Sequence, residues 1–167
     1  MDGITVSRGS MIAITVLRVL VGWHFLYEGL TKLTAPSWSS AGYLKQARGP
    51  LADFFRGLAA DPGQLANADM VTMWGLTLVG ACLILGLFTR LSSLAGMGFV
   101  FLFYIATPPF IGYFYSIPSE GSYLIVNKNL IEIAALAVIF TTRSGLYYGL
   151  DRIVHGVLPG RARLATA

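Results

Sequence analysis

The sequence predicts an all-α integral membrane protein: a bundle of four membrane-spanning helices with a short interfacial helix in the first outer loop. Of the 167 residues, 55% are hydrophobic and only 12% are charged, about half the charged fraction of a typical soluble domain. Four apolar segments are each long enough to cross about 30 Å of hydrocarbon at about 1.5 Å per residue. These spans leave little chain for anything else, so we expect residues 1–167 to form a single membrane domain.

The predicted spans cover residues 11–33, 70–89, 91–107 and 123–142. The second span contains no charged residue. The third begins after Arg90 and should stop before Pro108 and Pro109, because proline lacks a backbone donor and restricts the residue before it. The fourth carries Lys128 and Glu132 within an otherwise apolar run.

The first outer loop, residues 34–69, is the one sizeable extramembrane piece that we expect. Its stretch GPLADFFRGLAA places four large apolar residues at helical spacing: Leu51, Phe54, Phe55 and Leu58. This pattern predicts a short helix in the membrane interface, although a helix that caps the bundle would give the same pattern. Residues 143–167 are predicted to form a polar cytoplasmic tail that is disordered after Pro159.

Basic residues flank the predicted spans unequally, and this asymmetry predicts the orientation. With four crossings, the side with both termini holds six arginines and two aspartates: Arg8, Arg90, Arg143, Arg152, Arg161, Arg163, Asp2 and Asp151. The opposite side holds three cations and four anions: Lys45, Arg48, Arg56, Asp53, Asp61, Asp69 and Glu120. Cytoplasmic segments are enriched in Lys and Arg, so we expect the N- and C-termini to be cytoplasmic.

The first span carries four ionisable residues within RVLVGWHFLYEGLTKL: Arg18, His24, Glu28 and Lys32. At about 100° per residue they share one helix face about 120° wide. A charge at bilayer depth costs at least about 2.5 kcal/mol, so this face is expected to look into the bundle. Gly22 and Gly29 lie beside the same face, where another helix could approach closely.

The fourth span supplies partners for this face. Lys128 and Glu132 are four residues apart and share a helix face, and Asn127 adds an amide group. In a four-span topology, the end of the first span and the start of the fourth meet on the outer side. We therefore expect two facing ion pairs in the outer half of the bundle: Glu28 with Lys32, and Lys128 with Glu132.

Two interpretations of these polar groups stay open, namely a site that handles protons and a buried network that only fixes helix register. In the first, His24, Glu28 and Glu132 are the candidate proton-handling residues. Arg18 lies nearer the cytoplasmic end and is assigned a lipid-binding or structural role.

Aromatic residues gather at the predicted outer level: Trp38, Tyr43, Trp74, Tyr104, Tyr113 and Tyr115. Taken singly, each is typical of anchoring at the membrane interface. Together with the polar face they outline an amphipathic pocket suited to a ring with carbonyl groups and an apolar tail, which describes a quinone. The candidate quinone-binding residues are Lys32, Trp38, Tyr43, Trp74, Tyr104, Asn127 and Lys128.

The composition argues against several other cofactors and partners. The single cysteine, Cys82, cannot form an internal disulfide or hold an iron–sulfur cluster, and with His155 in the tail a bis-histidine haem is not expected. No flavin or metal site is evident, and the scattered basic residues argue against nucleic-acid binding. No cleavable signal peptide is expected, because the first apolar run is too long and contains charges.

The order of three segments resembles the DoxX family: RVLVGWHFLYEGLTKL, then LVGACLILGLFTRLSSLAG, then NKNLIEIAALAVIF followed by RSGLYYGLDR. The loop segments WSSAGYL and GPLADFF are similar to the DoxD-type branch, the membrane subunit of thiosulfate:quinone oxidoreductase. The resemblance covers about residues 17–152 and implies a multi-pass protein of the bacterial or archaeal cytoplasmic (inner) membrane, often associated with redox enzymes and quinone. It carries over no catalytic residues.

The sequence thus predicts a quinone-interacting membrane subunit of a sulfur- or thiol-linked redox system. Electrons would come from a partner protein, because the chain has no cofactor-binding domain and no cysteine pair. The alternative is a non-catalytic anchor or assembly subunit whose polar face docks helices or a partner. A small-solute transporter ranks third, because four short spans enclose little volume. The electron donor, the quinone and self-association as a homo-oligomer stay open.

Overall fold

The computed structural model describes residues 7–110, 112–116 and 124–157. Every regular element within these ranges is helical, as predicted. The described helices are α1 (Arg8–Thr34), α2 (Ala41–Lys45), α3 (Ala52–Ala60), α4 (Pro62–Leu85), α5 (Thr89–Ala106), α6 (Lys128–Thr142), α7 (Gly145–Tyr148) and α8 (Asp151–Val157). Arg161, Arg163 and Glu120, which enter the predicted orientation, lie outside the described residues.

Three helices, α1, α4 and α5, are long and apolar enough to cross a membrane. Their outward faces carry exposed large apolar side chains, among them Leu20, Leu78 and Leu91 at 62%, 59% and 67% exposure, as contact with lipid requires. The fourth predicted span corresponds to α6, whose 15 residues reach about 22 Å, less than the hydrocarbon thickness of about 30 Å. Three helices thus have the length and composition of membrane spans, and the fourth crossing remains a prediction.

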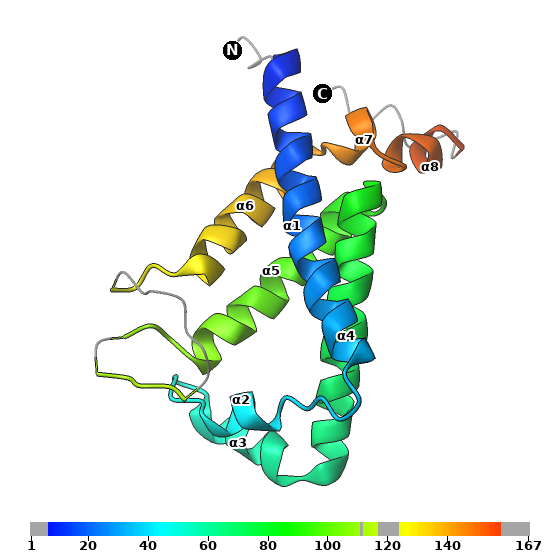
Figure 1. Ribbon diagram of the computed structural model, residues 1–167. Helices are drawn as coiled ribbons and strands as arrows, with labels where there is room; N and C mark the ends of the chain where they lie inside the picture. The colour runs from blue at the N-terminus through cyan, green and yellow to red at the C-terminus, as the bar shows by residue number, and fades with distance from the viewer. Residues whose placement is uncertain (1–6, 111, 117–123, 158–167) are drawn as a thin grey trace.

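The four longer helices form two pairs that meet at one end and diverge toward the other (Figure 1). α1 packs along α4, and α5 packs along α6. The short helices α2 and α3 join the diverging ends of α4 and α5. The backbone N–H of Arg48 fastens this connection by donating to the carbonyl of Ala106 at the end of α5.

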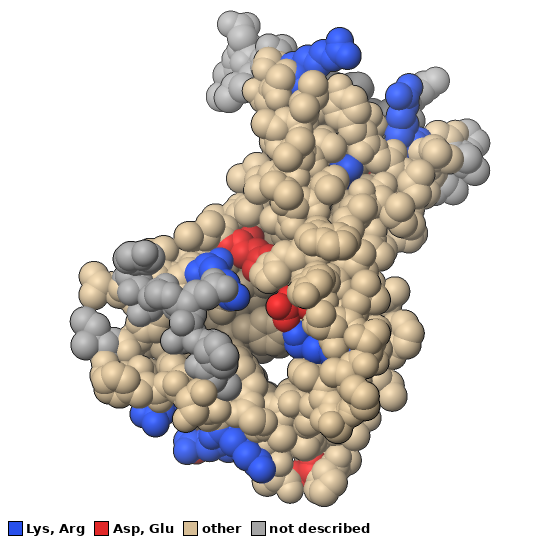
Figure 2. All heavy atoms as spheres, in the orientation of Figure 1, with Lys and Arg blue, Asp and Glu red and all other residues tan. Residues whose placement is uncertain are grey.

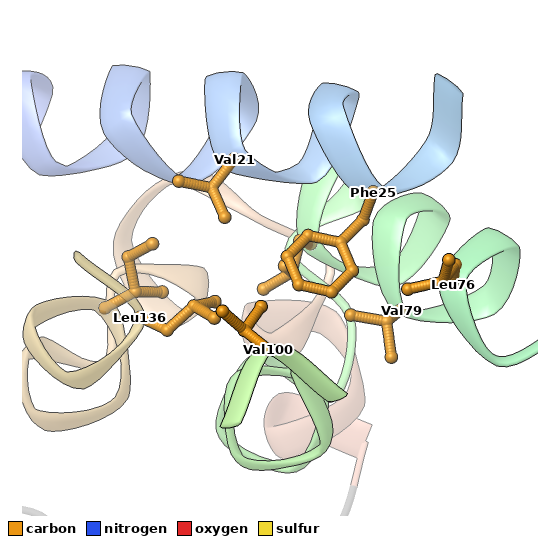
Figure 3. Packing of buried hydrophobic residues seen from close by; sticks show 8 residues of the cluster. Val21, Phe25, Leu76, Val79, Val100 and Leu136 are labelled. Carbon is orange, nitrogen blue, oxygen red and sulfur yellow. The ribbon is translucent and has the colours of Figure 1, made fainter. Parts of the chain in front are cut away.

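Buried apolar residues from both pairs form the core where the pairs meet (Figure 3). They are Val21, Phe25, Leu76, Val79, Leu83, Val100, Leu136 and Ile139. Leu83, Leu136 and Ile139 have no exposed surface. Because lipid is as apolar as these side chains, the core holds the pairs together at this end by close van der Waals packing.

Glycines allow α1 and α4 to pack in direct backbone contact. A Cβ on Gly29 would lie 2.5 Å from the backbone N of Thr77. A Cβ on Gly80 would lie 2.6 Å from the Cα of Leu26 and 2.7 Å from the carbonyl oxygen of Gly22. The prediction that another helix approaches α1 at Gly22 and Gly29 is confirmed, and that helix is α4.

The predicted outer loop is shorter in the structure, because α4 begins at Pro62 rather than at residue 70. Asp61 caps this helix by accepting hydrogen bonds from the N–H groups of Gly63 and Gln64, and proline suits the first helical turn. α4 then ends at Leu85, before the predicted limit at residue 89. The helix stops there because its C-cap residue, a glycine with φ 64°, adopts the left-handed conformation.

The helix predicted from GPLADFFRGLAA is present as α3, and a short α2 precedes it. Ala52, Phe55 and Ala59 are buried against α2 and the end of α5, whereas Leu51 and Phe54 are 46% and 58% exposed. One face of α3 therefore caps the bundle, while the other presents apolar groups outward. An interfacial position for that second face remains a prediction.

A buried polar contact closes the end of the bundle opposite α2 and α3. The Arg18 guanidinium is 1% exposed and donates to Ser144 Oγ at 3.2 Å and to the carbonyl of Tyr148 at 2.6 Å. Asp151 lies close enough to exert a Coulombic effect on Arg18. We refer to Arg18, Ser144, Tyr148 and Asp151 as the clasp, and it binds the segment after α6 to α1.

Asp151 also caps α5. Its carboxylate accepts hydrogen bonds from the N–H groups of Phe88 at 2.6 Å and Thr89 at 3.0 Å, at a helix whose own N-cap side chain makes no such bond. The predicted polar tail contains two short helices that the sequence did not predict, α7 and α8, and α7 contacts α1. Residues after 157, including the stretch predicted to be disordered, lie outside the described residues.

The glycine contact between α1 and α4 predicts the effect of adding one methyl group. Gly80→Ala should lower the free energy of unfolding by about 1–3 kcal/mol, because its Cβ would overlap the α1 backbone. The matched control is Gly98→Ala on α5, where an added Cβ meets nothing within 4 Å. Denaturation in mixed detergent micelles, followed by circular dichroism, measures both. Equal stability of the two variants would contradict this packing.

Candidate functional site

Ionisable residues of α1 and α6 gather where the two helix pairs diverge. Figure 2 shows this face of the molecule hollowed, with acidic and basic atoms on the sides of the hollow. We call the five residues His24, Glu28, Lys32, Lys128 and Glu132 the interhelical cluster. Its two carboxylates and two ammonium groups balance formally, so its net charge is zero with neutral His24 and +1 with protonated His24.

A hydrogen bond between α1 and α6 lies at the deep end of the cluster. His24 Nδ1 is 2.7 Å from Glu132 Oε1, and the two side chains are 42% and 12% exposed. When the imidazole is protonated, this contact is an ion pair. The sequence placed both residues on facing helices, but it named Lys128 as the partner of Glu132 and did not anticipate the contact with His24.

The predicted ion pair along α1 is confirmed. Lys32 Nζ donates to Glu28 Oε2 and, at 3.1 Å, to the backbone carbonyl of Glu28. The Lys32 side chain is 17% exposed, and its ammonium group lies over the ring of Trp38, 5.6 Å from the centroid. Trp38, which follows the end of α1, thereby joins the cluster through a cation–π contact.

Lys128 connects the two pairs electrostatically. It is the first residue of α6, and its charge acts on both His24 and Glu28. Glu28 in turn acts on His24. Because removing any one charge leaves others unbalanced at bilayer depth, the five groups form a coupled set rather than two independent pairs.

Other candidate residues make contacts elsewhere in the described structure. Tyr43 OH donates to the carbonyl of Phe103 and lies 2.8 Å from Thr107 Oγ1, which fixes α2 on α5. Burial raises the pKa of Tyr43 to about 12, so this phenol stays neutral. Tyr104 OH donates to the carbonyl of Ile125 at 2.8 Å and holds the segment before α6 against α5.

Two further candidate residues, Asn127 and Trp74, lie at the start of α6 and on α4. Asn127 Oδ1 accepts a hydrogen bond from the N–H of Leu130 at 3.2 Å, so this side chain is the N-cap of α6. This cap explains why α6 starts at Lys128 and not at residue 123. Trp74 is 53% exposed on α4. Arg18 belongs to the clasp, and the core separates it from the cluster.

A row of aromatic rings that the sequence analysis missed runs between α4 and α5. Phe99 packs against Gly75, where an added Cβ would meet its ring. Its centroid is 6.3 Å from that of Phe103, which is in turn 6.0 Å from Tyr43. Phe99 and Phe103 are four residues apart and so share one face of α5, a spacing from which this row could have been predicted.

Comparison with known protein families gives one match. A model of the DoxX family matches residues 13–108, more than half of the chain. The matched region contains His24, Glu28 and Lys32, whereas α6 with Lys128 and Glu132 follows it. No curated protein and no solved structure matches the chain.

The Glu28–Lys32 pair predicts that a second substitution restores part of the stability that the first one removes. Glu28→Ala should lower the free energy of unfolding by about 1 kcal/mol, because it leaves the largely buried Lys32 ammonium without this partner while Glu28 itself is half-exposed. Adding Lys32→Ala should recover part of the loss. Unfolding curves of the wild type, both single variants and the double variant test this, and strictly additive losses would contradict it.

Proposed function

Since the chain belongs to the DoxX family, we propose that it is the quinone-interacting membrane subunit of a sulfur- or thiol-linked redox system. The observation that carries this proposal is the interhelical cluster, which places polar groups in a hollow between apolar helices. A few convergent polar groups in an apolar site are what an amphipathic ring compound requires. The family membership supports a DoxX-type membrane protein, and the quinone is our inference from the site.

The residues present fit the two ends of a quinone ring. The ammonium groups of Lys32 and Lys128 are donors for carbonyl oxygens, and Trp38 beside Lys32 offers a flat apolar face. Phe99 and Phe103 supply apolar surface on the α5 side of the bundle. When bound, a quinone supplies a two-electron acceptor that takes up two protons as it is reduced.

The carboxylates and the histidine of the cluster would handle those protons. The 2.7 Å contact of His24 Nδ1 with Glu132 Oε1 is short enough for a proton to pass within an existing hydrogen bond. Glu28 lies near enough to influence the charge on His24 and forms the next acidic group toward α2. The electrons come from a partner protein with thiol or reduced-sulfur chemistry, because Cys82 alone cannot form a dithiol couple.

In this proposal the chain lies in a bacterial or archaeal inner membrane and crosses it four times, with both termini in the cytoplasm. α6 supplies the fourth crossing. Exposed arginines at the clasp end support the orientation: Arg8, Arg90, Arg143 and Arg152. Such residues favour the cytoplasmic side.

A non-catalytic anchor or assembly subunit is the second candidate, and one observation favours it. His24 pairs with Glu132 and Glu28 pairs with Lys32, so much of the cluster is satisfied within the chain. A network that only fixes helix register requires no more than this. Quinone binding therefore has to be measured directly.

Trp38 is a natural reporter, because it lies against Lys32. A variant with Trp23→Phe and Trp74→Phe keeps Trp38 as its one tryptophan. We expect saturable quenching of its fluorescence by decylubiquinone or by a short-chain menaquinone analogue. Adding Lys32→Met should weaken the apparent affinity at least about tenfold, since one hydrogen bond from a charged donor contributes about 1.5–3 kcal/mol.

The matched control keeps Trp23, which is 58% exposed on α1, in a variant with Trp38→Phe and Trp74→Phe. Its quenching should rise linearly with the quinone dissolved in the micelle. Linear quenching of Trp38 as well, with no effect of Lys32→Met, would refute the quinone site. If Glu28→Gln then releases a protein that co-purifies with the wild type, the anchor function is favoured.

A further inference from the structure

The interhelical cluster is sealed on the side of the core. Between it and the clasp lie Leu83, Leu136 and Ile139, with no exposed surface, and Phe25 at 3% exposure. Beyond this apolar layer, the clasp holds Arg18 in hydrogen bonds to the segment after α6. The apolar core and the clasp therefore block water and ions from reaching the cluster from this end of the molecule.

Polar groups continue from the cluster in the opposite direction. His24 and Glu132 lie deepest, and the Glu28–Lys32 pair follows one turn further along α1. Lys32 reaches over Trp38, and Ser40 at the start of α2 donates its backbone N–H to Asp69 of α4 at 2.8 Å. Polar groups therefore lie along α1 from its middle to its end, and the buried Ser40–Asp69 contact lies at the α2 end of the molecule.

Part of the cluster is also open. The side chains of His24 and Glu28 are 42% and 45% exposed. Figure 2 shows acidic and basic atoms on the sides of the hollow. Ionisable side chains at membrane depth face a bundle interior or a water-filled cavity, because exposing them to lipid is costly. A hollow lined by ionisable side chains is therefore expected to hold water rather than lipid acyl chains.

We propose that this hollow is a one-sided aqueous vestibule, through which water and protons reach the interhelical cluster only from the side of the membrane where α2 and α3 lie. Protons bound or released by the His24–Glu132 pair are exchanged with that side alone. The use of those protons rests on the proposed function. The vestibule itself rests on the apolar core between cluster and clasp, on the polar groups along α1 and on the hollow in Figure 2.

Cysteine accessibility tests this sidedness. In a Cys82→Ala background, which leaves no other cysteine, Glu28→Cys places one thiol in the hollow. Right-side-out and inverted membrane vesicles are treated with a charged, membrane-impermeant methanethiosulfonate. The thiolate is the reactive form, so a cysteine in water reacts quickly and one in lipid reacts slowly.

Three matched variants calibrate the rates. Ser39→Cys next to α2 and Gly9→Cys at the start of α1 report the two membrane sides, and Leu20→Cys reports a lipid-facing position at 62% exposure. Glu28→Cys should react at least about tenfold faster in the vesicles in which Ser39→Cys reacts. If Glu28→Cys does not fold, Thr31→Cys replaces it, since Thr31 is exposed near the same face of α1.

Reaction of Glu28→Cys from the Gly9 side, or at the slow rate of Leu20→Cys from both sides, would overturn the proposal. The outcome is distinct from that of the quinone experiment. One-sided labelling without saturable quenching of Trp38 would leave the vestibule standing and remove the quinone. Saturable quenching with no one-sided labelling would retain the quinone site and refute the vestibule.

Discussion

The hydrogen bond between His24 and Glu132 is the contact on which the arrangement of the site depends. The apolar core holds the two helix pairs together at one end, and glycines fix α1 on α4 within one pair. Beyond the core the pairs diverge, and this bond links α1 to α6 across the gap. Without it, a carboxylate that is 12% exposed would lose its partner at membrane depth, which costs several kcal/mol. The bond therefore sets both the spacing of the pairs and the charge balance of the cluster.

Local patterns predicted much of the fold and part of the site. The apolar spans, the glycine contacts of α1 and the Glu28–Lys32 pair all follow from helical periodicity or from residues four apart. The His24–Glu132 bond joins residues 108 positions apart, and Arg18 reaches Ser144 across 126 positions. Such contacts depend on how helices pack, which no local pattern in one sequence specifies. The N-cap role of Asn127 was not predicted, because the predicted fourth span began before this residue.

The two ends of the bundle differ in their chemistry. At the clasp end, hydrogen bonds of Arg18 and Asp151 to the backbone hold α5 and the segment after α6 in place. At the α2 end, ionisable groups surround a hollow and remain partly exposed. A sealed end and a partly exposed polar hollow within one membrane domain are what a site needs if it is to take a ligand from the membrane and exchange protons with one compartment. The family match covers only the α1 side of this site, so the contribution of α6 is argued from the structure.

A double-mutant cycle on His24 and Glu132 tests the central contact most directly. The free energies of unfolding of His24→Ala, Glu132→Ala and the double variant are compared with that of the wild type in the same detergent. We expect a coupling energy of at least about 1 kcal/mol, because each single change leaves the other group without its partner. The exposed Asp53–Arg56 pair on α3 serves as a control and should show little coupling. Additive losses at His24 and Glu132 would contradict the bond between α1 and α6 and the site built on it.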